Sequence, residues 1–563
     1  MQNSCRIVVL STEWWLVGIF EQRSAPSLIT PASKEPLLAA NLNVSVPSPR
    51  LADRRIHPWL LVAGYAVGTV LGYGFNFGLV PAALGLAAGL RLALHPHRTC
   101  RHNIGLFVAL AVGWSLAERW LGAYSTLAQV GLGVYTAFWP TLLVLLTGRR
   151  PGALWRFVIF GAALDALRGT WVFGGYGFDP WSRLLLANEG LAQWLSVFGP
   201  WISSALVLGF FVLPWRWSVG GVLSCMLMGS MLHPPPVESG LAFRLVQTNL
   251  PQNLRIGWPT ERWISDVTDF LSFSASGPPV DLVIWPETML PGFGFESETD
   301  VVDQLRSPWA EPARMVQHWA KEFDTPLLVG TNIRDGLVFD ERRLNWDRQV
   351  NASVLVRSDG THERAEKIGL TPFGEFIPLV STVPELRQLL LKFVPEGSPI
   401  GAGLAQGRAP GRFVLDSIRL ATPICYESTL PALMRSFAFE NGDRAAEVFV
   451  VSSNDGWFGE VDTARARFRD MCRMRAIENR TPVVRVANTG WTGLIDASGR
   501  MHTGLPVRDS GQITVQALVG EGTPLAVRAA LLWDWGLVLA GVGVGVWSLR
   551  QRRRGVEWDM LGS

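Results

Sequence analysis

Three short segments of the chain carry side chains that could perform covalent chemistry together. They read DLVIWPETMLP, with Glu287; EKIGLTPFGEFIPL, with Lys367 and Glu375; and LATPICYESTLP, with Cys425, Tyr426 and Glu427. A thiol is only a few per cent thiolate at neutral pH, so a nucleophilic cysteine needs a neighbouring base. A carboxylate can take the thiol proton, and an ammonium group can stabilise an oxyanion. The segments therefore indicate a thiol acyltransferase or amidase.

Each of these residues also has an ordinary structural interpretation. A carboxylate after a strand is often a turn or cap residue, a lone lysine is usually a solvated charge, and a cysteine in an apolar strand is usually buried filler. The combination favours chemistry, because each segment directly follows a predicted strand and has Pro and aromatic neighbours. The other four cysteines are too scattered for a disulfide framework or for a CxxC metal site.

The elements that must position these segments lie between residues 240 and 520. Short apolar runs predict strands at 243–248, 281–285, 326–331, 352–356, 418–424, 447–452 and 483–487. Amphipathic patterns predict helices at 260–273, 309–323, 429–439 and 463–480. Strands that alternate with helices in this way are typical of an α/β sandwich.

The remainder of the chain is too apolar for a purely soluble protein. Of its 563 residues, 48% are hydrophobic and only 17% are charged. Because a membrane helix needs about 20 apolar residues, we expect eight spans, at 57–74, 76–95, 104–122, 126–147, 153–172, 191–213, 217–233 and 526–549. Residues 1–56 are predicted to be a poorly structured extension. The net charge of +3 gives no support for nucleic-acid binding.

Arginine clusters predict the orientation of these spans. They lie at 50–55, 98–101, 149–150, 216 and 550–554, and all fall on one side if there are eight spans. Short basic loops stay in the cytoplasm, so both termini and the basic tail 550–563 are expected there. The segment 240–517 is then on the far side of the membrane. Arginines that merely cap helices would not readily produce this alternation.

The chain order of Glu, Lys and Cys resembles that of the nitrilase superfamily and, more narrowly, that of the apolipoprotein N-acyltransferases of the bacterial inner membrane. The shared motifs are LRG at 167–169, WPET at 285–288, PFGEFIPL at 372–379, ICYE at 424–427, SNDGWFG at 453–459, RMRAIENRTPVVR at 473–485 and NTG at 488–490. The resemblance implies a multispan α-helical membrane bundle of seven spans at 57–233, a nitrilase-like αββα sandwich at 240–517, and a closing transmembrane helix at 526–549.

The resemblance also implies roles for individual residues. Glu287 matches the catalytic base, Lys367 the catalytic lysine and Cys425 the nucleophile. The positions that match supporting or substrate-contacting residues are Glu375, Tyr426, Glu427, Asn351, Trp457, Phe458 and Trp258. The implied reaction moves a fatty acyl chain from a membrane phospholipid, through a Cys thioester, to the N-terminal amine of S-diacylglyceryl-cysteine apolipoproteins. It needs no metal or cofactor, and the catalytic domain would be periplasmic.

Four positions depart from the family pattern, and two other functions compete with the one implied. Arg467, Phe468, Trp491 and Gly369 stand where the family usually carries other residues. We expect Arg467, Phe468 and Trp491 to tune substrate preference and not the chemical step. A membrane-tethered amidase acting on a small amide is disfavoured because the domain is bound to the membrane at both ends. A non-enzymatic lipoprotein-binding module would not need Glu, Lys and Cys together.

The predicted orientation can be tested by cysteine labelling in intact cells. A membrane-impermeant thiol reagent should label single-Cys variants at exposed positions of the segment that holds Glu287 and Cys425. It should not label variants placed beside Arg98 or Arg552, because those positions are predicted to be cytoplasmic. If the central segment were labelled only after the membrane is broken open, the predicted number of spans would be wrong.

Overall fold

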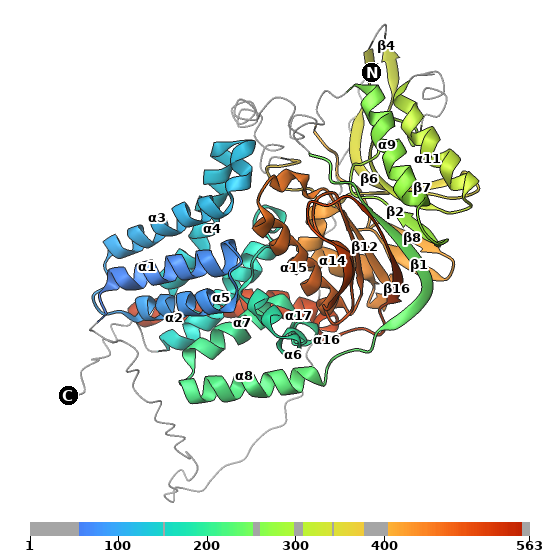
Figure 1. Ribbon diagram of the computed structural model, residues 1–563. Coiled ribbons are helices and arrows are strands. Elements are labelled where there is room, and N and C mark those ends of the chain that lie inside the picture. Colours follow the sequence, from blue (N-terminus) through green and yellow to red (C-terminus); the bar gives the residue numbers. More distant parts are fainter. Residues whose placement is uncertain are drawn as a thin grey trace, which may run out of the picture. The chain divides into compact units, whose positions relative to one another are not determined.

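The computed structural model describes residues 56–149, 152–251, 259–297, 308–340, 343–376 and 403–553. Figure 1 shows a group of helices beside two stacked β-sheets. The helices of the first group are α1 (Pro58–Thr69), α2 (Leu79–Leu94), α3 (Cys100–Ala117), α4 (Thr126–Thr147), α5 (Ala153–Thr170), α6 (Glu189–Ala192), α7 (Leu195–Val212) and α8 (Trp215–Ser230). Three short 3₁₀ helices join them: η2 (Arg119–Ala123), η3 (Val172–Gly174) and η4 (Trp181–Ala187).

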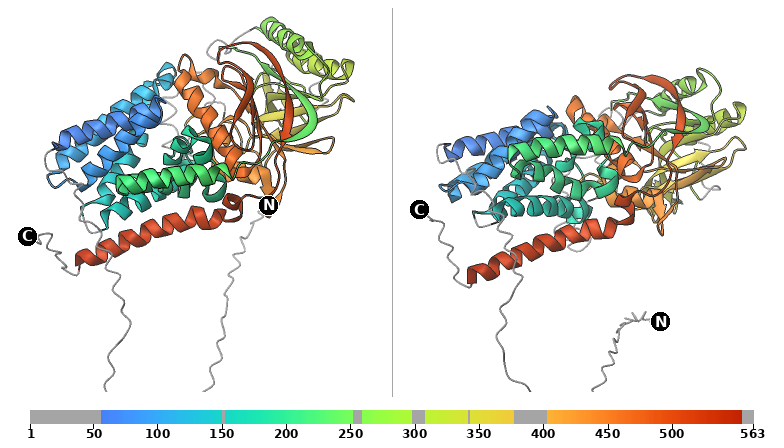
Figure 2. Two further views of the ribbon diagram at one scale, coloured as in Figure 1. Left: turned by 60° about the horizontal axis from the view of Figure 1, so that its bottom comes forward. Right: turned by 90° about the horizontal axis from the view of Figure 1, so that it is seen from below.

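Each of the eight expected membrane spans coincides with one helix of this structure. The eighth is α17 (Ala530–Arg553), which follows the short helix α16 (Leu525–Arg528). Although it is distant in sequence, α17 packs along α5 and α7, as both views of Figure 2 show. Among the described helices, α4, α7 and the Ala530–Arg550 part of α17 are long and apolar enough to cross a membrane, and α2 is apolar but shorter. The number of eight spans therefore stays a prediction.

The second part of the fold consists of two six-stranded sheets. The first has the order β16 (Gly511–Val519), β1 (Val237–Gln247), β2 (Leu282–Ile284), β3 (Leu327–Asp335), β6 (Arg348–Val356) and β7 (His362–Glu366). The second has the order β15 (Met501–Leu505), β14 (Thr492–Ile495), β13 (Val483–Ala487), β12 (Val448–Ser453), β9 (Ile418–Ala421) and β8 (Arg412–Leu415). In each sheet three neighbouring strands are parallel and the outer strands are antiparallel.

Helices cover the outer face of each sheet, so the layers run α, β, β, α. Helices α9 (Thr260–Ala275) and α11 (Glu311–Glu322) pack on the first sheet through residues such as Phe270 and Val316. Helices α14 (Pro431–Ala438) and α15 (Asp462–Asn479) pack on the second through residues such as Phe437. Between the sheets lies a core that includes Leu245 and Val450. Because the central strands are buried on both faces, their sequences are almost continuously apolar.

All seven strands and all four helices predicted between residues 240 and 520 are present. Their ends differ from the predicted ends by a few residues, and the largest difference is at the start of β1, which begins at Val237. The prediction missed the strands β7, β8, β14, β15 and β16, which lie at or next to the sheet edges. It also missed two small two-stranded sheets, formed by β4 (Val338–Asp340) with β5 (Arg343–Asn345) and by β10 (Phe439–Glu440) with β11 (Asp443–Arg444). The expected αββα sandwich is confirmed.

Helix α15 connects the sandwich to the helical part through a buried ion-pair cluster. The Arg467 guanidinium lies 2.7 Å from Glu118 Oε1 and also pairs with Asp179. All three side chains are almost fully buried. A second cation, Arg183, lies 3.3 Å from Asp179. Glu118 directly follows α3, and Asp179 lies just before η4. The cluster therefore connects these two helices to α15.

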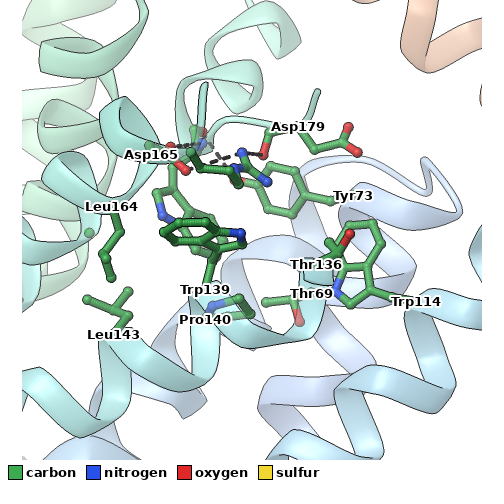
Figure 3. Close-up of a pocket in the computed structure, with 13 residues that line it drawn as sticks. Thr69, Tyr73, Trp114, Thr136, Trp139, Pro140, Leu143, Leu164, Asp165 and Asp179 are labelled. Carbon is green, nitrogen blue, oxygen red and sulfur yellow. Dashed lines mark hydrogen bonds and ion pairs between the residues drawn. The ribbon is translucent and has the colours of Figure 1, made fainter. Parts of the chain in front are cut away.

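A small cavity lies behind this cluster, inside the helical part. Figure 3 shows Asp165 and Asp179 at its upper end, with Pro140 and Leu143 below them. Its volume is about 30 Å³, which is room for about one water molecule. None of its lining residues belongs to the three segments singled out in the sequence. The cavity is therefore not the site that these three segments form.

Replacing Arg467 by Gln should weaken the fold strongly, because it leaves Glu118 and Asp179 buried without this cation. Breaking a buried ion pair on one side typically costs about 3–5 kcal/mol. A matched control is Arg500→Gln, since Arg500 also pairs across to the helical part, with Glu189, but both side chains are at least half exposed. Thermal unfolding of the detergent-solubilised variants should show a large drop in Tm for Arg467→Gln only. Equal drops for both would contradict a special role for the buried cluster.

Candidate active site

The three predicted catalytic residues each follow the end of a strand, and the fold brings these strand ends together. Glu287 comes three residues after β2, Lys367 directly follows β7, and Cys425 lies four residues after β9. The strands β2 and β7 belong to one sheet and β9 to the other. The site is thus built across the interface between the two sheets.

Lys367 is the centre of the charged part of the site. Its Nζ lies 3.1 Å from Glu287 Oε1 and 2.7 Å from Glu375 Oε1, and the side chain is 1% exposed. Burial alone would lower the pKa of Lys367, but the charges of Glu287 and Glu375 outweigh burial and raise it well above its usual value. The lysine is therefore a permanent cation. Glu375 is held in place by the backbone N–H of Thr371, at 2.7 Å.

Glu287 is held by two further donors besides the lysine. Asn351 Nδ2 donates to Oε1 at 2.7 Å, and the backbone N–H of Asn454 donates to Oε2 at 2.8 Å. The turn that carries Glu287 also needs Gly330 on β3, because a Cβ there would lie only 2.7 Å from the Cα of Glu287. Glu287 is thus fixed by one cation and two hydrogen bonds in a buried position.

Cys425 sits at a sharp turn from an extended segment into a 3₁₀ helix, η7 (Cys425–Thr429). Ile424 still bridges to Ser452 of β12, whereas Cys425 has a positive φ of 52°. A non-glycine residue in this left-handed region costs roughly 1–2 kcal/mol. Its side chain is partly exposed. Burial, together with the negative charge of Glu287, raises the pKa of the Cys425 thiol well above its usual value, and Lys367 only partly opposes this.

The two residues after the cysteine hold the turn in place. Glu427 accepts hydrogen bonds from the N–H groups of Ile368 and Gly369, both at 2.7 Å, and from that of Ile424 at 2.6 Å. It therefore ties the segment after Lys367 to the segment before Cys425. Tyr426 donates its hydroxyl to the carbonyl of Gly175 at 2.6 Å. This bond connects the cysteine turn to the loop between α5 and η4.

Trp457 and Phe458 lie on η8 (Asp455–Phe458) and face aromatic side chains of the helical part. The ring of Trp457 is 5.1 Å from that of Tyr124, and the ring of Phe458 is 4.9 Å from that of Trp120. Apolar aromatic surface of this kind can contact an acyl chain. Trp258, the remaining predicted contact, lies outside the described residues.

The four departures from the family pattern occupy different surroundings. Arg467 forms the ion pairs with Glu118 and Asp179 described above. Phe468 lies 5.9 Å from Phe178 and 6.2 Å from Phe458, measured between ring centroids, so it borders the aromatic group. Trp491 is partly buried and packs against the core beside α15. At Gly369 a Cβ would come within 2.6 Å of a terminal methyl group of Leu433, so a larger residue here would require the Leu433 side chain to shift. Their effect on substrate preference stays a prediction.

Several polar residues near the site were not singled out from the sequence. Asn454 binds Glu287 through its backbone N–H, and a backbone group gives no signal in a sequence. Ser453 lies near Cys425, and Asp455 pairs with Arg485. Asn488 donates to Asn454 Oδ1 at 3.0 Å. All of them belong to motifs quoted from the sequence, Asn488 to the NTG motif, but only the folded chain shows their partners.

The class of the sandwich domain follows from its match to a family model. Residues 253–518 match the model of the carbon-nitrogen hydrolase family. This confirms the expected resemblance of the central segment to the nitrilase superfamily.

Three similar proteins that match more than the sandwich domain are each named apolipoprotein N-acyltransferase. The chain is 29% identical over 329 residues to an apolipoprotein N-acyltransferase of Geobacter metallireducens, a match that covers 57% of this chain and 56% of that one. It is 29% identical to that of Rhodopseudomonas palustris, over 72% of this chain and 78% of the relative. It is 27% identical to that of Caulobacter vibrioides, over 87% and 96%. The chain thus spans little more than half of the first relative and almost all of the third, and the narrower resemblance is confirmed.

Solved structures are similar to about half of the chain. A CN-hydrolase superfamily protein of Xanthomonas campestris is 18% identical, with a TM-score of 0.32, over 52% of this chain and 94% of that one. An amidase of Nesterenkonia sp. is 16% identical, with a TM-score of 0.34, over 53% and 98%.

The buried carboxyl of Glu427 should make stability depend on pH. Burial raises its pKa from 4.5 to about 7, although its hydrogen bonds from backbone N–H groups oppose the shift. Between these pH values the folded chain holds the proton more tightly than the unfolded chain, so the free energy of unfolding should fall as the pH rises from 4.5 to about 7. Glu427→Gln cannot titrate and should flatten this slope in denaturant titrations.

A matched control for this measurement is Glu363→Gln. Glu363 is half exposed and pairs with Arg357 at the surface, so its removal should leave the slope unchanged. Glu478 also has a pKa raised to about 7 by burial and contributes to the same slope, so a part of it should persist in Glu427→Gln. An undiminished slope in Glu427→Gln would contradict the prediction.

Proposed function

We propose that this protein is an N-acyltransferase that moves a fatty acyl chain from a membrane phospholipid to the N-terminal amine of diacylated apolipoproteins. The observation that carries the proposal is a buried Glu287–Lys367 pair beside Cys425. In the sequence, the domain that holds these residues is preceded and followed by apolar helices. Relatives that match most of the chain are named apolipoprotein N-acyltransferase, and this supports the choice of substrates. The amidase alternative has no observation of its own in its favour.

In the first half-reaction, the Cys425 sulfur attacks the ester carbonyl carbon of the phospholipid. Its proton passes to Glu287, which is needed because the thiol pKa is raised in this site. The charge that develops on the carbonyl oxygen is stabilised by Lys367, together with a backbone N–H next to Cys425. When the carbon–oxygen bond breaks, Glu287 returns the proton to the departing alkoxide. The products are a thioester on Cys425 and a lysophospholipid.

In the second half-reaction, the α-amine of the apolipoprotein attacks the thioester carbonyl. Lys367 again stabilises the oxyanion, and Glu287 takes a proton from the attacking nitrogen. The carbon–sulfur bond then breaks, the proton returns to the sulfur, and the product amide leaves. The cycle restores the thiol and the carboxylate, so no external acid or base is consumed. Glu375 keeps Lys367 in position throughout.

The helical part explains why a lipid can be the donor. A phospholipid with two acyl chains has a negligible free concentration in water, so the site must be reached from the bilayer. Trp457 and Phe458 extend from the site towards Trp120 and Tyr124 of the helical part, which gives an acyl chain a continuous aromatic surface. The orientation inferred from the arginine clusters would put this site at the outer face of the bacterial inner membrane.

The thioester is the decisive test. Protein incubated with phospholipid and no acceptor should accumulate one fatty-acyl mass on Cys425, released by neutral hydroxylamine. Cys425→Ser should abolish it, because a hydroxyl of far higher pKa is not activated by a base that suffices for a thiol. Glu287→Gln should also prevent it, and Lys367→Ala should slow it by about 10²–10³ fold, the usual effect of losing an oxyanion donor. Mass spectrometry of the Cys425 peptide measures all four.

Cys472→Ser is the matched control for this experiment. Cys472 is fully buried on α15 and contacts Ser428, so its thiol cannot meet a lipid ester. The variant should acylate Cys425 at the normal rate. An acyl group on Cys472, or full transfer activity in Cys425→Ser, would overturn the proposed nucleophile. Transfer without any covalent intermediate would favour direct attack of the amine on the phospholipid.

A further inference from the structure

A second group of buried polar side chains, separate from the one around Lys367, lies beside Cys425. Ser453 ends β12, and its Oγ lies 3.9 Å from Cys425 Sγ. The same hydroxyl donates a hydrogen bond to Asp455 Oδ1. Asp455 Oδ2 in turn lies 2.7 Å from Arg485 Nη2. These three side chains are at most 1% exposed, so the chain is shielded from water.

The positions of Asp455 and Arg485 are closely constrained. A Cβ at Gly490 would lie 1.8 Å from Asp455 Oδ2, so only glycine leaves room for the carboxylate. Arg485 also donates to the carbonyl of Trp491, and its guanidinium lies 5.2 Å from the ring centroid of Phe468. Removing either charge would leave the other buried without compensation. Asp455 is therefore a fixed acceptor beside the Ser453 hydroxyl.

The proton count of a hydroxyl limits what Ser453 can do in each state of the site. A hydroxyl has one proton to donate and two lone pairs, whereas an ionised carboxylate only accepts. While the Ser453 proton points to Asp455, its oxygen can accept the S–H of the resting Cys425 thiol. When the thiol loses its proton the sulfur becomes an acceptor, and the hydroxyl can rotate to donate to it. A hydrogen bond to an ionised group is about twice as strong as one between neutral groups.

We propose that Ser453 is a further catalytic residue, whose hydroxyl turns from Asp455 to the Cys425 sulfur when the thiolate forms. The inference rests on the proposed function, in which Cys425 is the nucleophile. The proton balance is complete: the thiol proton goes to Glu287, and Ser453 keeps its own proton and only changes its acceptor. Asp455 retains its pair with Arg485 after the hydroxyl has turned away.

The proposed role of Ser453 addresses a specific difficulty of this site. The charged groups that act on the thiol are Glu287, Lys367, Glu375 and Asp455, of which three are negative. Lys367 is already shared between Glu287 and Glu375. A thiolate among carboxylates needs a donor that can turn to it during the step. The Ser453 hydroxyl can leave Asp455, because Arg485 keeps that carboxylate paired.

The neighbouring residue Ser452 provides a matched control. It lies on the same strand, is 4% exposed, and its hydroxyl has no hydrogen-bond partner among the described residues. Successive side chains of a strand point to opposite faces, so Ser452 points away from the Ser453 side. Ser452→Ala removes the same atom from the same strand without touching the Cys425 contact.

The experiment measures the rate at which iodoacetamide alkylates Cys425 as a function of pH. The full chain is used in detergent, and the Cys425 peptide is followed by mass spectrometry because other cysteines are present. Ser453→Ala should slow alkylation at a fixed pH about tenfold, which corresponds to a rise of about one unit in the thiol pKa. Ser452→Ala should keep the wild-type profile, and Ser453→Thr, which retains the hydroxyl, should restore it.

Asp455→Asn provides a second variant with the opposite expected result. It removes a negative charge and the competing carboxylate, so alkylation should become faster than in the wild type. Because Arg485 loses its buried partner, thermal unfolding of the variant is measured alongside, and the comparison is made below its Tm, where the chain is folded. Slower alkylation in Asp455→Asn, or equal profiles for Ser453→Ala and Ser452→Ala, would overturn the inference. The acyl thioester is measured on the same wild-type preparation. Its absence from Cys425 would refute the proposed function, whereas an unchanged Ser453→Ala profile with a normal thioester would refute only the role of Ser453.

Discussion

The site depends on one buried ammonium group held between two carboxylates. Lys367 pairs with Glu287 and Glu375, and removing one partner of such a pair typically costs about 3–5 kcal/mol because a charge stays buried alone. Glu287 comes from one segment and Lys367 and Glu375 from another, so the ion pair between Glu287 and Lys367 fixes the ends of β2 and β7 relative to each other. Burial of the thiol, together with the net negative charge of this group, raises the pKa of the neighbouring Cys425 and keeps it protonated until a base acts on it.

The same physical constraint recurs where the sandwich meets the helical part. Apolar packing alone would allow the two parts to slide, since the hydrophobic effect is not directional. Buried polar contacts fix a single register: Arg467 with Asp179, the Tyr426 hydroxyl with the Gly175 carbonyl, and Gln193 with the Ser498 carbonyl at 2.9 Å. Two of them hold the loop 171–180 against the residues around Cys425. The relative position of the two parts is therefore set by directional polar contacts in addition to apolar ones such as the Trp120–Phe458 and Tyr124–Trp457 ring contacts.

The sequence predicted the buried strands and amphipathic helices because the spacing of their apolar residues is visible within a short stretch of the chain. The edge strands β7, β8 and β16 were missed, since edge strands are half exposed and have a weaker pattern. For the site, residue types and motif order indicated Glu287, Lys367 and Cys425, but not what holds them. Glu287 is bound by the backbone N–H of Asn454, and Gly330 is required by a close approach between neighbouring strands. Neither interaction has a side-chain signature, so both follow only from the folded chain.

The turns that carry Glu287, the proposed base, and Cys425, the proposed nucleophile, both contain backbone strain. Cys425 has a φ of 52°, and Thr288, the residue after Glu287, has a φ of 53°. Such conformations cost roughly 1–2 kcal/mol each for residues other than glycine, and they persist only where surrounding interactions determine them. At Cys425 the turn is held by the three hydrogen bonds that backbone N–H groups donate to Glu427. At Glu287 the turn fits because Gly330 has no side chain. A relaxed turn at either position would change the direction of the following side chain. We therefore interpret Glu427 as the residue that keeps the sulfur directed into the site, although it does not touch the reacting atoms itself.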